Sequence, residues 1–262
     1  MQALRTAATG MAAQQLNVEV ISNNIANMNT VAFKRQRAEF QDLLYQTLEQ
    51  PGAQTSDQGT IVPTGVQIGA GVKAGSVYRI ATQGAMTRTD NKFDLAIDGR
   101  GFFQVLTPTG ETAYTRAGNL AINDQGQLVT QDGYQIQPAV TIPNDATEVS
   151  ISPAGQVQVT QPGSPTANTV GTIELATFMN EGGLSAKGAN LLMETAASGP
   201  AITGTPGTQG MGALLQGYTE ASNVDAVGEI TALIVAQRAY EMNSKVISTA
   251  DNMLGVANQV KS

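Results

Sequence analysis

The side chains best suited to chemistry in this chain are aspartates that recur at short intervals. Asp90, Asp94 and Asp98 form one group, and Asp124 and Asp132 form another. Two facing carboxylates can act as the acid and the nucleophile or base of glycoside hydrolysis. Most of these aspartates, however, stand beside Gly or Asn, where an aspartate typically bonds its own backbone in a turn. Because only 5% of the residues are aromatic, few rings could stack on a sugar, and we interpret the aspartates as turn residues.

A second pattern of chemical interest is Gly69-Ala-Gly71-Val-Lys-Ala74, which matches the loose G-x-G-x-x-A form of a dinucleotide-binding loop. Asp90 or Asp94 lies about twenty residues further on, where such a loop has its acidic partner. That chemistry requires a helix whose amino end points at the pyrophosphate. The residues that follow, Ser76–Ile80, are typical of a strand. The pattern therefore predicts a glycine-rich loop and no cofactor.

Two residue types on which much enzyme chemistry depends are missing, because the chain has neither Cys nor His. A thiolate nucleophile, a disulfide, a zinc–sulfur site and an imidazole base are therefore ruled out. The net charge is −7, and the longest basic cluster is Lys34, Arg35 and Arg37. A nucleic-acid groove needs more clustered cations than that. We expect no catalytic residue, no cofactor, no metal site and no nucleic-acid partner.

The amino-terminal residues do not resemble a secretory signal. Their longest purely apolar run is Met11-Ala12-Ala13, whereas a signal peptide needs roughly seven to fifteen apolar residues. No stretch of the chain approaches the ~20 apolar residues of a membrane helix. We expect no membrane insertion, and export without a cleaved signal peptide if the protein is exported.

Residues 1–43 predict a helical zone with one apolar heptad stripe. Its members recur at alternating three- and four-residue steps, and Gln14 is the only polar one. Residues 1–33 carry just two charges, Arg5 and Glu19, which suggests burial against several neighbours. Gly10 weakens a helix by ~1 kcal/mol relative to Ala and indicates a close contact. The stripe residues that we assign to self-assembly are Leu4, Met11, Val18, Ile21, Ile25 and Met28.

Residues 221–262 predict a second long helix, with a Ser-x-x-Asp start signal at Ser222 and Asp225. Two heptad stripes coexist along it, ~100° apart around the axis. A two-stranded coiled coil needs only one such seam, so two seams indicate a multi-helix assembly. An intramolecular hairpin of the two terminal helices remains the alternative. The residues assigned to self-assembly are Leu233, Tyr240, Ile247 and Leu254 in the first stripe, and Val235, Met242, Val246 and Met253 in the second.

Residues 66–220 predict a compact, mainly antiparallel β domain inserted between the terminal helices. Turn sequences such as Thr107-Pro-Thr-Gly110 and Ser152-Pro-Ala-Gly155 separate its short apolar stretches. Residues 44–65 show neither periodicity and predict an extended segment. The fold class is α+β, with 1–43 and 221–262 forming one discontinuous, coiled-coil-like helical domain. The expected strands include Val77–Ala81, Asp94–Ile97, Phe102–Leu106, Thr112–Thr115, Leu128–Val129, Glu148–Ile151, Gln156–Thr160 and Thr172–Phe178.

Several blocks of residues, in the same order and over nearly the whole chain, resemble the flagellar rod and hook protein family. They are Ser22–Asn27 with Thr30–Arg35, Gly99–Phe103, Tyr114–Gly118, Asn123–Val129, Phe178–Asn180, Gly217–Val224 and Gln237–Lys245. Ala32 stands where the family usually has Gly. Since Gly adopts positive φ freely and Ala does not, we expect the turn after the first helix to differ locally.

Within this family, residues 44–65 resemble an extra segment that distal rod subunits carry and hook subunits lack. The residues assigned to this rod-specific segment are Tyr45, Gln50, Pro51, Gly52, Gln54 and Pro63. The resemblance therefore favours a distal rod subunit. The alternatives are a hook or proximal rod subunit of the same family and, in a different class, a secreted β-rich carbohydrate-active protein.

The resemblance implies a non-enzymatic subunit that assembles with itself into a straight helical rod. This rod would carry motor torque through the periplasm and the outer membrane to the hook. The terminal helices would line its core, the β domain would form its outer shell, and residues 44–65 would lock neighbouring subunits. The implied partners are the proximal rod proteins, the hook protein, the P- and L-ring proteins, the rod cap and the flagellar type III export apparatus.

Overall fold

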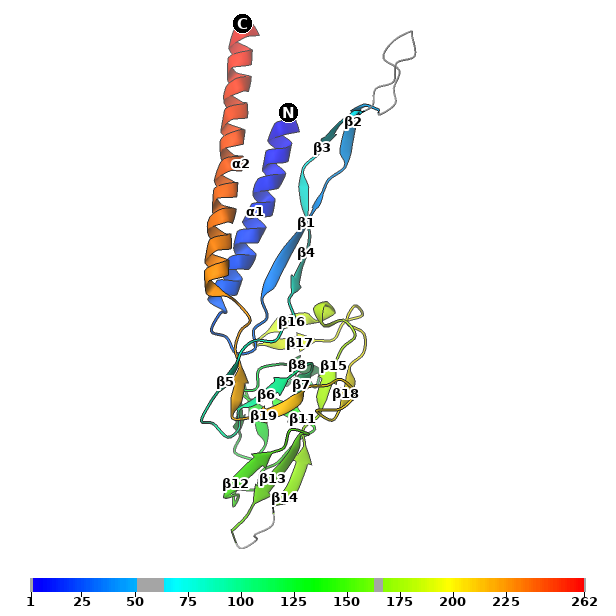
Figure 1. Ribbon diagram of the computed structural model, residues 1–262, viewed down its shortest axis with the longest axis vertical. Coiled ribbons are helices and arrows are strands. Elements are labelled where there is room, and N and C mark those ends of the chain that lie inside the picture. The colour runs from blue at the N-terminus through cyan, green and yellow to red at the C-terminus, as the bar shows by residue number, and fades with distance from the viewer. Residues whose placement is uncertain (1, 51–63, 163–166, 262) are drawn as a thin grey trace. The chain divides into compact units, whose positions relative to one another are not determined.

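The computed structural model describes residues 2–50, 64–162 and 167–261 (Figure 1). A long helix lies near each end of the chain and short strands fill the sequence between them, which confirms the predicted α+β class. The chain forms two compact units. The first comprises residues 1–26, 36–78 and 225–262, and the second comprises residues 27–35 and 79–224. Within the described residues, neither helix carries an apolar stretch long enough to cross a membrane.

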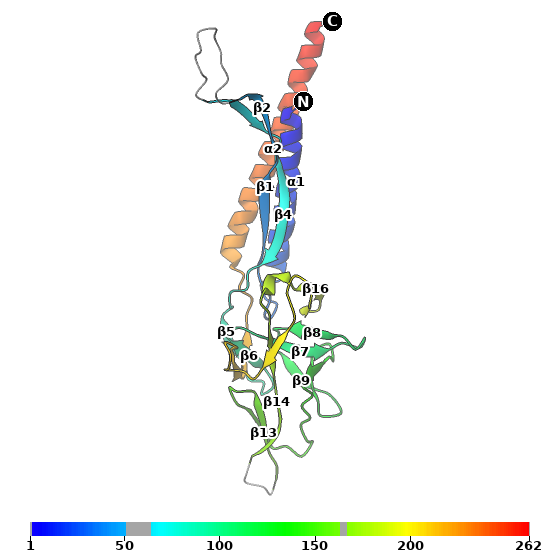
Figure 2. The ribbon, with the colours of Figure 1, turned by 90° about the vertical axis from the view of Figure 1, so that its right-hand side faces the viewer.

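The first unit contains two antiparallel helices, α1 (Gln2–Ala26) and α2 (Ala226–Lys261), which pack side by side (Figures 1 and 2). The amino end of α2 is capped by Asp225, whose Oδ1 accepts a hydrogen bond from the Val227 amide at 3.2 Å. Ser222 lies outside the helix, where its Oγ accepts a hydrogen bond from the Val224 amide at 3.3 Å. The predicted start signal is therefore carried by Asp225 alone.

A strand ribbon completes the first unit. In it, β1 (Gln36–Asp42) pairs with β4 (Val72–Arg79), and β2 (Tyr45–Glu49) pairs antiparallel with β3 (Val66–Gly69). Hydrogen bonds from Leu43 N–H to Gly71 O and from Ala70 N–H to Leu44 O join the two pairs. Gly71 has φ +122°, and a Cβ there would lie 2.2 Å from Thr9 Oγ1. This glycine lets the ribbon approach α1, and the strand predicted after it, in place of a nucleotide-binding helix, is confirmed.

The structure corrects the sequence-based elements of this unit. Residues 36–42, placed in the helical zone, form β1, and the helix expected to continue through Met28 ends at Ala26. The cause is Asn24, whose side-chain amide pairs with both backbone groups of Gln36 and so draws the chain back along the helix. Residues 45–49 and 66–69, expected to be extended and part of the β domain respectively, pair with each other.

The boundaries between compact units also differ from the predicted ones. The structure groups residues 66–78 with the helices because β3 and β4 find their partners in β2 and β1. It groups residues 27–35 with the β-rich unit, where Ala32 N–H donates to Glu220 O at 2.8 Å. As a division by role, the three-part scheme of 1–43 with 221–262, 44–65 and 66–220 stays a prediction.

The second unit is built of short, mainly antiparallel strands. Its largest sheet runs in the order β16-β17-β8-β7-β11-β10-β9, with β15 pairing to β7 and β18; β12-β13-β14, β19-β6 and β20-β5 form smaller sheets. The strands are β5 (Met86–Arg88), β6 (Leu95–Asp98), β7 (Phe102–Leu106), β8 (Thr112–Thr115), β9 (Leu120–Ile122), β10 (Leu128–Thr130), β11 (Gln135–Gln137), β12 (Glu148–Ile151), β13 (Gln156–Thr160), β14 (Asn168–Thr172), β15 (Leu175–Thr177), β16 (Ser185–Gly188), β17 (Leu191–Met193), β18 (Ile202–Gly204), β19 (Ala213–Gln216) and β20 (Tyr218–Glu220), with a short 3₁₀ turn at Glu181–Gly183.

Four predicted strands coincide with β7, β8, β12 and β13. One predicted strand, Thr172–Phe178, is wrong because the structure divides it between β14 and β15. The break falls at Ile173, whose amide donates to Gly155 O at 2.7 Å and whose side chain is fully buried. The predicted strand therefore spans a bend between β14 and β15, and no Gly, Pro or other turn residue between the two strands indicates this bend.

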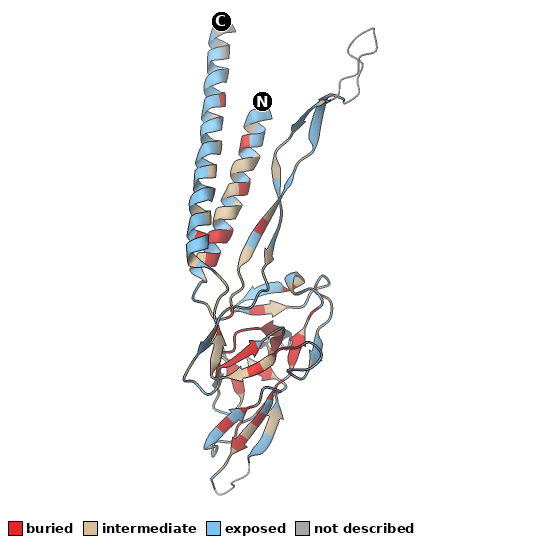
Figure 3. Cartoon of the chain, in the orientation of Figure 1, coloured by how far each residue is buried: buried red, intermediate tan, exposed pale blue. Residues whose placement is uncertain are grey.

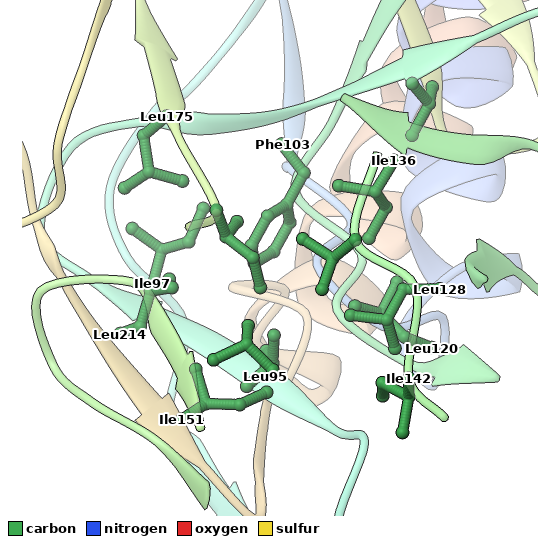
Figure 4. Packing of buried hydrophobic residues seen from close by; sticks show 14 of the residues in the cluster. Leu95, Ile97, Phe103, Leu120, Leu128, Ile136, Ile142, Ile151, Leu175 and Leu214 are labelled. Atoms are coloured by element: carbon green, nitrogen blue, oxygen red, sulfur yellow. The ribbon is translucent and has the colours of Figure 1, made fainter. Parts of the chain in front are cut away.

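The core of the second unit lies where these sheets meet. Leu95, Ile97, Phe103, Leu128 and Leu175 are each at most 1% exposed and contribute to one apolar cluster (Figure 4). Figure 3 shows the buried residues concentrated in this unit, whereas α2 is largely exposed and α1 carries buried, half-buried and exposed residues. The hydrophobic effect of burying these side chains stabilises the folded second unit.

The structure places the five aspartates in different local settings. Asp90, Asp98, Asp124 and Asp132 are exposed, and Asp94 accepts a hydrogen bond from Asn91 Nδ2 at 2.8 Å. Asp124 and Asp132 stand in turns. The interpretation as turn residues agrees with the positions of Asp124 and Asp132, whereas Asp98 is the last residue of β6 and Asp94 forms an isolated β-bridge.

We expect the core of the second unit to be sensitive to a methyl group at Gly118. A Cβ there would lie 1.5 Å from Leu95 O, so Gly118→Ala must displace β6 and should lower the free energy of unfolding by about 3–5 kcal/mol. Gly110→Ala is the matched control: Gly110 has φ +82° with open space around it, and its substitution should cost only ~1 kcal/mol. Urea unfolding followed by the tyrosine near-ultraviolet signal measures both, and equal losses would contradict the close approach.

Candidate self-assembly surface

The first stripe of α2 faces α1 within the first unit. Ala236 and Ala250, which lie on this stripe at heptad spacing from the residues named above, are buried, and Leu233 and Ile247 are half-buried. A Cβ on Gly10 of α1 would lie 2.9 Å from Asn243 Nδ2, so the close contact predicted at this glycine is confirmed. One stripe of α2 is thus occupied inside a single chain.

The second stripe of α2 faces solvent. Val235, Met242, Val246 and Met253 are 47–64% exposed, and Val256 continues the row at 59%. Soluble monomers rarely leave a contiguous apolar face of this kind uncovered. We call these five residues the open stripe. Packing within the first unit does not explain it.

Two residues assigned to the first stripe are less covered than the others. Tyr240 and Leu254 are 42% and 40% exposed. Helix α2 has 36 residues and α1 has 25, so α2 is longer by roughly 16 Å at ~1.5 Å per residue. Leu254 falls in the excess length, where α1 offers no neighbour.

The amino end of α1 is flanked by two hollows. Ala3, Met242, Val246, Ala250 and Met253 contribute to a mainly apolar hollow of ≈ 470 Å³. A second hollow of ≈ 500 Å³ reaches the ribbon at Ile68. Three residues of the open stripe therefore line a concave surface that a further apolar element could fill.

The residues assigned on α1 differ in exposure. Ile21 is buried, and Leu4, Met11, Val18 and Ile25 are half-buried. Met28 lies two positions beyond the end of α1 and is 40% exposed. Its place in the helical stripe was wrong because the helix stops before it.

The rod-specific segment is only partly within the described residues. Tyr45 opens β2 and is 56% exposed, and Gln50 is exposed at the end of that strand. Pro51, Gly52, Gln54 and Pro63 lie outside the described residues. The described ribbon also leaves apolar side chains uncovered, namely Leu44, Leu48, Val66 and Ile68 at 41–88% exposure.

A buried amide that the sequence reasoning did not select holds the first unit together. Asn24 is 1% exposed, and its Nδ2 donates to Gln36 O at 2.8 Å and to Glu229 Oε2 at 3.1 Å. Its Oδ1 accepts from Gln36 N–H at 2.8 Å. One side chain thus joins α1, β1 and α2. The signal was available, because Asn24 sits among the apolar stripe residues Ile21 and Ile25.

A buried ionic cluster in the second unit also escaped the sequence reasoning. Glu220, 1% exposed, accepts hydrogen bonds from Lys34 Nζ at 2.5 Å, Arg116 Nε at 2.7 Å and Gly84 N–H at 2.8 Å. Arg116 further donates to the carbonyl oxygens of Gly99 and Gly101 at 2.6 and 3.0 Å. Lys34, Arg116 and Glu220 come from three separate blocks of the family resemblance, and we call them the Glu220 cluster.

The charge state of Glu220 follows from this surrounding. Burial pushes the pKa of its carboxyl upward, but the charge of Arg116 and the hydrogen bonds from Lys34, Gly84 and Arg116 together outweigh burial. The pKa of Glu220 therefore lies below its ordinary value of 4.5. Because the unfolded carboxyl binds its proton first, the stability contributed by ionised Glu220 is present above pH ~4.5 and is lost as pH falls through the folded pKa.

Comparison with known proteins gives matches along most of the chain. The description "Flagella basal body rod protein" matches residues 4–34, "Flagellar hook protein FlgE/F/G D1 domain" matches residues 96–159, and "Flagellar basal body rod FlgEFG protein C-terminal" matches residues 215–260. The Glu220 cluster draws one residue from each matched region.

Relatives that match over nearly their full length are also flagellar basal-body rod proteins. The flagellar basal-body rod protein FlgG of Caulobacter vibrioides is 70% identical over 262 residues, covering 100% of both chains. The proteins of that name from Agrobacterium fabrum and Borreliella burgdorferi are 49% and 48% identical; the first comparison covers 99% of each chain, and the second covers 100% of this chain and 99% of the relative.

Replacing Glu220 should destabilise the second unit strongly. Glu220→Gln leaves Lys34 and Arg116 buried without their counter-charge, which should lower the free energy of unfolding by about 3–5 kcal/mol at pH 7. Glu148→Gln, at an exposed carboxylate, should change it little. Denaturant unfolding between pH 3 and pH 7 tests both points. A Glu220→Gln variant that loses as much stability in acid as the unaltered protein would contradict the assigned pKa.

Proposed function

The chain belongs to the flagellar basal-body rod protein family, and from this premise we propose that it assembles with copies of itself into the straight distal rod. In this role it is a structural subunit of the flagellar basal body, and its sites are surfaces for other subunits. The open stripe of α2 is the observation that carries the proposal. An apolar helix face beside an already filled one gives each subunit a surface for the next.

The open stripe also bears on the choice between an intramolecular hairpin and a multi-helix assembly, the two interpretations of the stripes on α2. The intramolecular hairpin accounts for the first stripe, which packs on α1, but leaves Val235, Met242 and Met253 uncovered. Helices of neighbouring copies would bury these side chains, each worth about 1.5–3 kcal/mol when fully removed from water. We propose that the hairpin is the building block and the open stripe is the contact between blocks.

The ribbon extends the proposed contact surface. Its exposed apolar side chains, together with the rod-specific segment, would pack on adjacent subunits and hold them in one relative orientation. A subunit held at two separate surfaces cannot pivot about either one, which favours a straight rod over a curved tube. The hook and proximal rod alternatives are not favoured, because relatives that are 48–70% identical over nearly the whole chain are named flagellar basal-body rod protein FlgG.

The proposed rod also defines the location and the partners of the subunit. The rod would cross the periplasm and the outer membrane, with the proximal rod proteins at one end and the hook protein at the other. The P- and L-ring proteins would surround it, the rod cap would guide its growth, and the flagellar type III apparatus would export its subunits. The non-enzymatic role rests on relatives that are rod proteins.

Met242→Asp tests the open stripe. Met242 is 64% exposed in the single chain, so a carboxylate there should leave the melting temperature of the monomer within about 1 °C of the original. In the assembled rod the same carboxylate would be buried and unpaired at a cost of several kcal/mol. Electron microscopy should show folded protein that forms no rods.

The matched control is Ser244→Asp, at an exposed position of α2 that belongs to neither stripe. This variant should still form rods. Rods from Met242→Asp, or a clear fall in the melting temperature of its monomer, would contradict the open stripe as the contact between copies.

Deleting residues 51–63 tests the rod-specific segment. The deletion leaves β2 and β3 in place, and we expect subunits that still assemble but give curved or flexible tubes. Curvature measured by electron microscopy is the readout. Straight, rigid rods from the deletion variant would remove this segment from the proposed role.

A further inference from the structure

A small cavity lies inside the second unit beside the Glu220 cluster. Its volume is ≈ 30 Å³, enough for one or two particles the size of a water molecule. Lys34, Arg79, Arg116 and Glu181 contribute its charged lining, and Phe102 and Leu192 contribute apolar wall. Three of its four charged neighbours are cations.

The two carboxylates near this cavity, those of Glu220 and Glu181, already form ion pairs. Glu220 is shared by Lys34 and Arg116, and Glu181 pairs with Arg100 Nε at 2.9 Å. Arg79 has no carboxylate within ion-pair distance among the described residues. Among the described residues, Arg79 is therefore the one cation of the cavity wall that has no ion pair with an acidic side chain.

Arg79 also has an unused donor. Its Nη2 donates to Leu184 O at 3.2 Å, whereas its Nη1 is buried and meets no acceptor in the described part of the chain. Lys34 uses two of its three N–H donors, on Glu220 Oε1 and on Thr82 O at 2.8 Å. Two cationic residues on the cavity wall thus each retain a donor.

The protonation behaviour of Arg79 and Lys34 reflects their burial. Burial lowers the pKa of the Arg79 guanidinium. Burial also lowers the pKa of Lys34; the hydrogen bond that Lys34 donates to Glu220 opposes this shift, and the neighbouring charge of Arg116 adds to it. An arginine stays protonated in proteins, so a partner of opposite sign would stabilise Arg79 in this position.

We propose that this cavity binds one small monovalent anion of the size of chloride, held by Arg79 Nη1 and Lys34 Nζ. The cavity volume excludes phosphate, sulfate and carboxylic acids. The carboxylate of Glu181 on the same wall favours a single negative charge, and Arg100 reduces its repulsion. The site would lower the cost of burying Arg79 and so tie the anion to the stability of the second unit.

The direct test uses ³⁵Cl NMR on the full-length monomer. A chloride ion held in the cavity and exchanging with solution broadens the ³⁵Cl line, and bromide should reverse this broadening by competing for the same cavity. Wild-type protein that gives no saturable broadening, or broadening that bromide leaves unchanged, would overturn the proposal. Either result would assign the cavity to water.

A second test measures thermal unfolding at constant ionic strength while gluconate, too large for the cavity, is replaced by chloride. The melting temperature should rise by a few degrees and then saturate, because only the folded state binds the anion. Arg79→Met keeps the length of the side chain and should abolish the chloride dependence, whereas Arg88→Met, at an exposed arginine, should retain it. Equal chloride dependence in both variants would overturn the assignment to Arg79.

Discussion

The structure of the second unit depends on one buried carboxylate. Glu220 is 1% exposed and is held by Lys34, Arg116 and the Gly84 amide. In a chain with only 13% charged residues, such a cluster is costly to bury unless every charge is paired. The pairing fixes the turn after α1, the strand that ends at Thr115 and the last strand before α2 in one arrangement. Apolar packing of the core stabilises this arrangement but does not specify which segments meet.

Sequence periodicity predicted those helices and strands whose apolar residues recur at regular spacing. The two terminal helices and strands such as Phe102–Leu106 and Gln156–Thr160 were found because alternation and heptads report burial directly. Their ends were less predictable. Helix α1 stops at Ala26 because Asn24 bonds Gln36 twelve positions later, and no local pattern announces a bond across that distance. Ala32 then takes φ +57°, the conformation that a glycine would adopt without strain.

The sequence predicted which residues form the two stripes of α2, but not which stripe is covered by other side chains. Heptads identified two stripes on α2, yet only three-dimensional packing shows that Ala236 and Ala250 are covered while Met242 and Met253 are open. The ribbon was missed because its strands pair across residues 50–65. Neither the helical nor the strand periodicity of a sequence shows which distant segments pair with each other. The Glu220 cluster was missed for the same reason, since each of its charges is unremarkable in its own segment.

The long separations within the Glu220 cluster bear on how the chain folds. Lys34 and Glu220 are 186 residues apart, and Arg116 and Glu220 are 104 apart. Contacts of such high contact order form late, because the loop between them must close before the contact returns any energy. A chain delivered amino end first would carry Lys34 and Arg116 without their counter-charge until nearly the last sixth of the polypeptide arrived. The Glu220 cluster can therefore close only when about five sixths of the chain is present.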